Sequence, residues 1–124
     1  MIHEAVEKAV LRYRDGKTER VDLAPIEHDH DREVFRVTRE DGTKSEIPYS
    51  ALKAVFFPKK DGAVQQEALG STLAVEFSDG EVIRGIAHYN PERNGFFLFP
   101  LDRTKNDRVY VVNSAIVSIE VERL

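Results

Sequence analysis

The stretch His28-Asp29-His30-Asp31 holds the residue types in this sequence that are best suited to chemistry. Residues two apart on an extended strand share a face, so both imidazoles could contact one metal ion with a carboxylate beside them. Two histidines are too few ligands for a structural zinc site, however. The stretch also falls where the chain is expected to turn, and a solvated polar turn is the simpler interpretation. We therefore assign no metal site.

Two serines recur in the same setting, because Ser50 and Ser114 each precede an alanine and an apolar tail. A serine nucleophile needs a base beside it, and no base recurs with these two. A serine at a chain corner usually bonds to backbone groups instead. The chain has no cysteine, which excludes thiolate chemistry and disulfides. We expect a protein that is not an enzyme and that carries no cofactor.

Composition indicates a folded protein, since 41% of the 124 residues are apolar and 32% are charged. The net charge is −4, and neither half of the chain has a basic surplus. Proteins that bind nucleic acid usually have one, so a nucleic-acid partner is not expected. The first residues do not resemble a signal peptide, and no apolar run approaches the roughly 20 residues of a membrane helix. We expect a cytoplasmic protein without membrane contact.

The elements that must position these residues form a pattern that occurs twice, at an offset of 64 residues. Asp15-Gly16 falls on Asp79-Gly80, and Ser50-Ala51 falls on Ser114-Ala115, with no gap between the two matches. Apolar positions between them agree in phase, which favours an internal duplication. The offset also matches Arg20 with Arg84, Phe35 with Phe99, Arg39 with Arg103, and Ile47 with Val111.

Each copy predicts five short strands joined by tight turns. In the second copy, T-L-A-V-E-F-S alternates with period two, and Ser78-Asp79-Gly80 forms a turn. Gly85, within the next strand, is typical of a sharp bend. The predicted fold is all-β, with two tandem five-stranded Sm-like or SH3-like small barrels. The predicted units are a first barrel over residues 1–57, a linker over 58–71 and a second barrel over 72–124.

The second copy resembles the Sm-like fold, the small barrel of Sm and Hfq proteins. D-G-E-V-I-R-G-I-A-H-Y-N is similar to the first Sm motif, and V-V-N-S-A-I-V-S-I lies where the second motif has its strand, corner and final isoleucine. In RNA-binding members, an Asp and an Asn hold bases near the positions of Tyr89 to Gly95. Asn113-Ser114 replaces the second motif's basic residue and glycine. This resemblance implies RNA binding as the alternative function.

The whole chain also resembles a bacterial family of uncharacterised domains, sometimes found beside signalling modules. The residues that carry this resemblance are V-E-F-S-D-G-E-V-I-R-G, G-F-F-L-F-P-L-D and V-V-N-S-A-I-V-S-I. The resemblance implies an accessory or adaptor role in bacterial signalling, without known catalysis.

Five of the seven phenylalanines are concentrated in two runs, at Phe56-Phe57 and Phe96-Phe97-Leu98-Phe99, and the other two are Phe35 and Phe77. A half-exposed strand would alternate, so the second face of these runs must be covered. The other copy is the favoured cover, and a partner protein or a second copy of the chain is the alternative. We expect a binding or adaptor module that contacts a protein partner, with a homo-oligomer left open. The expected contact residues are Tyr89, Arg93, Phe96, Phe97, Phe99 and Leu101.

Overall fold

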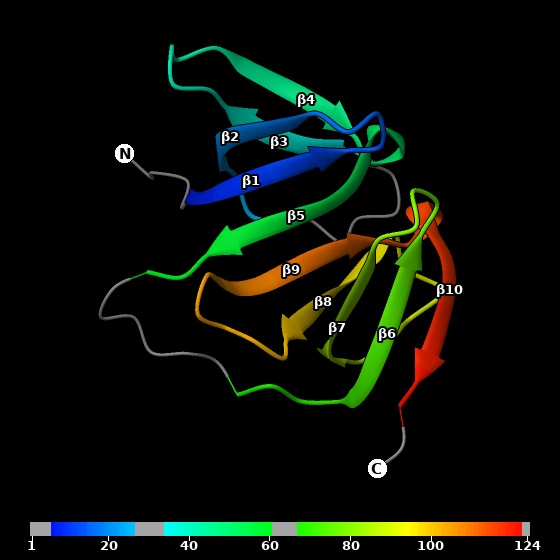
Figure 1. Cartoon of the computed structure of the whole chain (residues 1–124). Coiled ribbons are helices and arrows are strands. Elements are labelled where there is room, and N and C mark those ends of the chain that lie inside the picture. Colours follow the sequence, from blue (N-terminus) through cyan, green and yellow to red (C-terminus); the bar gives the residue numbers. More distant parts are fainter. Residues whose placement is uncertain (1–5, 27–33, 61–66, 123–124) are drawn as a thin grey trace.

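The computed structural model describes residues 6–26, 34–60 and 67–122. These residues form one antiparallel sheet of ten strands with two short 3₁₀ turns, which confirms the predicted all-β class (Figure 1). Within this described part of the chain, no helix has the length and apolar character needed to cross a bilayer.

The elements follow the same order in each half of the chain. The first half comprises β1 (Glu7–Tyr13), β2 (Thr18–Leu23), β3 (Val34–Thr38), β4 (Lys44–Pro48), the 3₁₀ turn η1 (Tyr49–Ala51) and β5 (Leu52–Pro58). The second half comprises β6 (Ser71–Phe77), β7 (Val82–Ala87), β8 (Gly95–Pro100), β9 (Asn106–Val112), the 3₁₀ turn η2 (Asn113–Ala115) and β10 (Ile116–Val121).

The Asp-Gly turns form as the sequence predicts. Gly16 and Gly80 have φ angles of 95° and 89°, which glycine adopts without steric penalty. The preceding aspartates accept backbone hydrogen bonds two residues on, from Lys17 N to Asp15 Oδ1 at 2.9 Å and from Glu81 N to Asp79 Oδ1 at 3.0 Å. Each turn therefore joins two strands of a hairpin.

The two predicted small barrels are not closed, because the described strands form a single open sheet. The strand order is β10-β6-β7-β8-β9-β5-β1-β2-β3-β4, and its two ends do not pair. The halves meet where β9 pairs with β5, which run side by side in the middle of the molecule (Figure 1). Strand β5 at one edge of the first half thus pairs with β9 at one edge of the second half, and neither half closes into a barrel.

Strand registers match between the halves, with one shift. The β1–β2 and β6–β7 pairs agree at the offset of 64, from Glu7 opposite Leu23 to Ser71 opposite Ala87. Strand β8 instead corresponds to β3 at an offset of 61, because residues 88–94 form a connection three residues shorter than residues 24–33. The ungapped alignment is therefore wrong at this strand. Phe35 lies opposite Ile47 in the first half. The equivalent residue in the second half is Phe96, which lies opposite Val111, and not Phe99.

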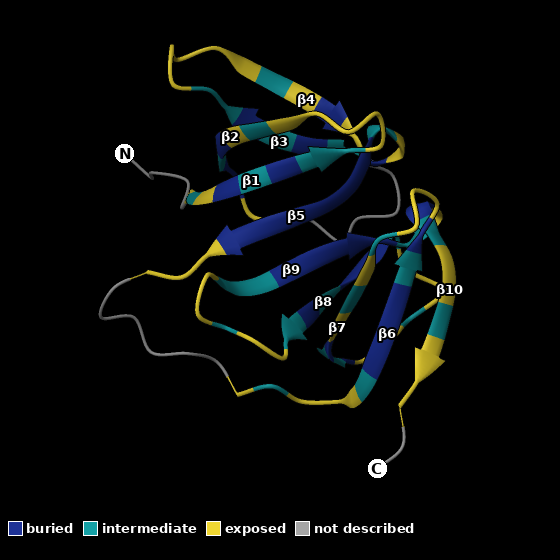
Figure 2. Ribbon diagram, viewed as in Figure 1, coloured by how far each residue is buried: buried dark blue, intermediate teal, exposed yellow. Residues whose placement is uncertain are grey.

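Two hydrophobic cores share β5 and β9. Along β5, Val55 and Phe57 point into the core of the first half, and Ala54 and Phe56 point into the core of the second. Figure 2 shows β5 buried along nearly its whole length. Both faces of this strand are covered by the two halves, so the expected cover for Phe56-Phe57 is found within the chain. Strand β9 divides in the same way, with Tyr110 and Val112 in the first core and Val109 and Val111 in the second.

Gly85 permits a close approach between two strands. A Cβ atom at this position would lie 2.4 Å from Leu98 Cδ2 and 2.4 Å from the carbonyl oxygen of Phe99. Its counterpart in the first half is Val21, which is buried with its side chain in the first core. The glycine is thus required by the packing of β8 against β7.

Candidate functional site

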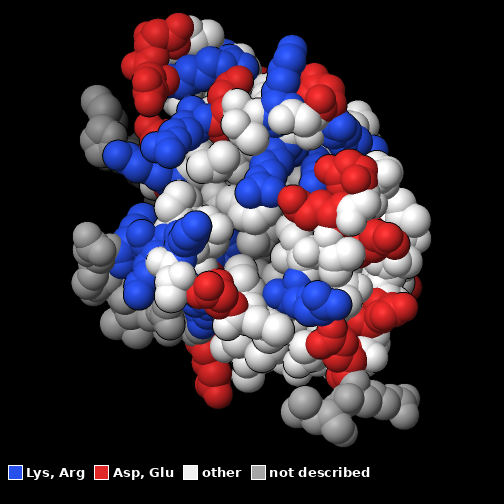
Figure 3. Space-filling view, in the orientation of Figure 1, with Lys and Arg blue, Asp and Glu red and all other residues white. Residues whose placement is uncertain are grey.

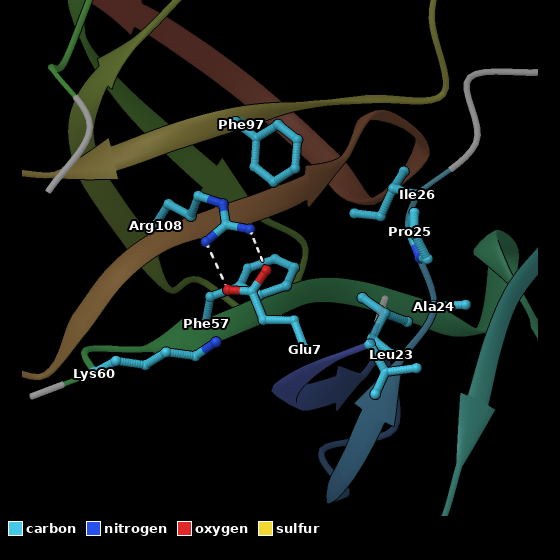
Figure 4. A pocket seen from close by; sticks show the side chains of 10 residues that line it. Glu7, Leu23, Ala24, Pro25, Ile26, Phe57, Lys60, Phe97 and Arg108 are labelled. Carbon is cyan, nitrogen blue, oxygen red and sulfur yellow. Dashed lines mark hydrogen bonds and ion pairs between the residues drawn. The ribbon is translucent and has the colours of Figure 1, made fainter. Parts of the chain in front are cut away.

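A pocket of about 350 Å³ lies where the two halves meet. One wall comes from the chain before and within β1 and from the segment after β2, and the other comes from β5, β8 and β9 (Figure 4). The pocket therefore exists only because the halves are joined. Its lining residues are Val6, Glu7, Leu23, Ala24, Pro25, Ile26, Phe57, Lys60, Phe97 and Arg108.

An ion pair between Glu7 and Arg108 forms the polar part of the lining. The guanidinium donates two hydrogen bonds to the carboxylate, at 2.9 Å from Nη1 to Oε2 and at 2.6 Å from Nη2 to Oε1 (Figure 4). Arg108 also lies over the ring of Phe57, with Cζ 4.1 Å from its centroid, and 5.3 Å from that of Phe97. The bonds to Glu7 raise the pKa of Arg108, so the guanidinium stays charged. This geometry is bidentate and stacked, which is the arrangement that fixes an arginine most firmly.

The rest of the lining is mainly apolar. Leu23 and Ala24 are buried, and the backbone N–H of Ala24 donates to the carbonyl of Arg36 at 3.0 Å, which holds the segment after β2 against the sheet. Val6 is 53% exposed at the pocket. Lys60 contributes a cation that has no ion-pair partner among the described residues. The arrangement is suited to enclosing an apolar group with an acidic group beside it.

A model of a family of unknown function (DUF6982) matches residues 5–123. The chain belongs to this family. No curated protein and no solved structure matches it. Membership agrees with the expected resemblance to an uncharacterised domain, and the match includes every lining residue of the pocket.

Strand β8 divides the predicted contact residues of this family member between two faces. Phe97 lines the pocket, and its ring lies 6.0 Å from that of Phe57. Phe96 points into the core of the second half. Tyr89, 46% exposed, meets Phe96 edge-on with ring centroids 5.5 Å apart. The structure therefore brings Tyr89 to Phe96 and separates both from the pocket face of Phe97.

The other three predicted contact residues lie outside the pocket. Phe99 is half-buried, with Cζ of Arg103 5.1 Å from its ring centroid. Leu101 is 58% exposed just beyond β8. Arg93 is exposed in the turn before β8.

The residues at the Sm-like positions hold a turn. Asn113 Nδ2 donates to the carbonyl of Asn90 at 2.9 Å and to that of Arg93 at 2.7 Å. The backbone N–H of Asn113 donates to the carbonyl of Asn94 at 2.8 Å. The side chain of Asn113 therefore holds the turn that contains Asn90 and Arg93, which is the region where the resemblance implies base contacts.

The repeated corner serine also has a contact within the chain. Arg14 Nη2 lies 2.5 Å from Ser114 Oγ, and Arg14 Nε donates to the carbonyl of Leu52 at 3.0 Å. Ser114 thus connects the second half to the first. The stretch His28-Asp29-His30-Asp31 lies outside the described residues, and the described residues contain no group of three or more potential metal ligands.

Most of the pocket could not be predicted from the sequence. Glu7 and Arg108 are 101 residues apart, and no local pattern connects them. The run L-A-P-I at residues 23–26 was the available signal, because it keeps apolar residues beyond the end of a strand where a polar turn is usual.

Proposed function

We propose that this protein is a non-catalytic binding module that captures a partner protein by enclosing one of the partner's apolar side chains in the junction pocket. The observation that carries this proposal is the pocket itself, an opening between two cores with apolar walls from both halves. Burial of one aliphatic or aromatic side chain contributes about 1.5–3 kcal/mol to binding.

The charges of the pocket support binding over catalysis. Glu7 and Arg108 satisfy each other, so neither is available as a free acid or base. The remaining ionisable lining residue is Lys60. A cation at the rim favours a partner segment with an acidic residue next to its apolar one.

We also propose that the two halves arose by duplication of a small Sm-like unit. The matched registers of β1–β2 with β6–β7 support this, as does the bulge that occurs at the same place in β1–β5 and β6–β10. In each half the last strand pairs with the first, so the order is β5-β1-β2-β3-β4 and β10-β6-β7-β8-β9. The pocket is then a product of the junction and not of either unit.

A matched pair of valines tests the proposed binding. Val6 is 53% exposed at the pocket, and Val117 is 62% exposed on β10. Tagged wild type, Val6→Asp and Val117→Asp proteins are used to capture partners from native lysate, with and without nuclease. We expect a protein that survives nuclease to be captured by wild type and Val117→Asp and lost with Val6→Asp.

Two outcomes would count against this function. Capture that is equal for all three proteins would show that the pocket is not used. Capture that disappears with nuclease would support the alternative, an Sm-like RNA-binding protein.

A further inference from the structure

A second groove, here called the outer groove, lies on the outer face of the first half. Its volume is about 490 Å³, and it lies over β1, β2 and the end of β5. Figure 3 shows Lys and Arg side chains gathered over this part of the molecule, with acidic side chains more frequent toward β10. Its charged lining residues are Lys8, Arg20, Asp22, Glu40, Lys59 and Lys60.

The second half shows how the same position is neutralised. Arg20 lies opposite Val10 on β1, and its counterpart Arg84 lies opposite Ala74 on β6. Arg84 forms an ion pair with Glu122, at 2.8 Å from Nε to Oε1. Glu122 follows β10 directly, and the residue at its position in the first half is Pro58. Two arginines in equivalent places therefore differ in whether a described residue supplies a counter-charge.

The first half supplies cations where the second half supplies an acid. Lys59 and Lys60 follow Pro58 and line the outer groove together with Arg20 and Lys8. None of the groove's charged side chains forms an ion pair or hydrogen bond with another described residue. Among the described residues, Arg20 and the three lysines of the groove therefore have no ion-pair partner that would compete with a bound anion.

The charge balance indicates the kind of ligand. Four cations and the two carboxylates of Asp22 and Glu40 leave a surplus of two positive charges. A phosphate monoester carries about −1.5 to −2 at neutral pH and presents three acceptor oxygens. A guanidinium can bind two of them in parallel, and lysine ammonium groups bind phosphate as point charges.

We propose that the outer groove binds a phosphomonoester dianion, with Arg20 as the central contact and Lys8, Lys59 and Lys60 around it. This site is separate from the junction pocket, although Lys60 lines both. The phosphomonoester belongs either to a free small molecule or to a phosphorylated side chain of a partner.

Titration calorimetry at constant ionic strength tests the site with four compounds: inorganic phosphate, O-phosphoserine, a short alanine peptide with one central phosphoserine, and the same peptide unphosphorylated. Arg20→Gln is the test variant, and Arg84→Gln is its matched control because both arginines are exposed on equivalent strands. We expect phosphoserine binding that Arg20→Gln weakens about tenfold or more and Arg84→Gln leaves unchanged.

The results separate the two sources and can overturn the site. Tighter binding of the phosphopeptide than of phosphoserine assigns the ligand to a partner side chain, and equal affinity assigns it to a free small molecule. Absence of binding at millimolar concentrations overturns the proposal. Equal weakening by Arg20→Gln and Arg84→Gln, or equal binding of the unphosphorylated peptide, also overturns it, because either shows only a diffuse charge effect.

Discussion

Replacement of Glu7 by glutamine tests whether the Glu7–Arg108 pair holds the junction of the two halves. The substitution keeps the shape of the side chain and removes its charge. Arg108 then keeps a guanidinium that is 18% exposed, stacked on Phe57, with Asp107 Oδ2 at 3.6 Å as its remaining acidic neighbour. The variant therefore leaves a largely buried cation partly uncompensated.

The expected loss of stability lies between two limits. Pairs on the surface contribute about 0–1 kcal/mol, and removal of one member of a fully buried pair costs about 3–5 kcal/mol. The side chains here are 18% and 31% exposed, so we expect Glu7→Gln to lower the free energy of unfolding by about 2 kcal/mol. The melting temperature should fall by about 8 °C at this chain length.

Urea unfolding of Glu7→Gln, Arg108→Met and the double variant measures the interaction. We expect a coupling free energy of about 1–2 kcal/mol, because the bidentate bonds are lost in either single variant. The control is Glu122→Gln, which breaks the Arg84–Glu122 pair, 59% and 38% exposed, and should cost less than about 0.5 kcal/mol. A coupling below about 0.5 kcal/mol, or an equal loss in the control, would show that the Glu7–Arg108 pair does not hold the junction.

Three further predictions concern the fold. Gly85→Ala should lower the free energy of unfolding by about 1–3 kcal/mol, since its Cβ would overlap Leu98 and Phe99; an unchanged urea midpoint would contradict this. The hydrogen bond from Lys53 lowers the pKa of Asp79 below its ordinary 3.8. The stability that this bond gives the folded protein is therefore present above pH 3.8, and it is lost as the pH falls through the lower pKa of the folded state. Asp79→Asn should flatten the fall of melting temperature in this acidic range, and an unchanged pH profile would count against it. On β5, Ala54 and Phe56 lie at the junction, and the equivalent residues on β10 are Ser118 and Glu120. The double variant Ser118→Ala/Glu120→Phe makes the edge strand β10 resemble β5, so light scattering should show self-association that the wild type lacks.

Local patterns predicted the strands well. Alternation, the Asp-Gly turns and the Ser-Ala corners gave the order of elements that both halves share, because these features depend on neighbouring residues. The uninterrupted apolar runs also predicted that both faces of their strands would be covered. Val55 and Phe56 accordingly point into different cores.

The connection between the halves could not be predicted from such patterns. Closed barrels and an open shared sheet need the same strands, and the choice depends on which edge pairs with which over a long sequence distance. The β5–β9 pairing joins Ala54 to Val111, and neither residue carries a local signal for that contact. The pocket follows from this pairing, which is why Glu7 and Arg108 were not predicted as neighbours.

The most direct test of the junction pocket as a binding site is photo-crosslinking from a benzoylphenylalanine placed at position 6. The same group at position 117 on β10 serves as the control. After irradiation in native lysate and nuclease treatment, mass spectrometry identifies the adducts. We expect one protein partner to be crosslinked through an apolar segment at position 6 and to be absent at position 117. The same adducts at both positions, or none at position 6, would contradict it.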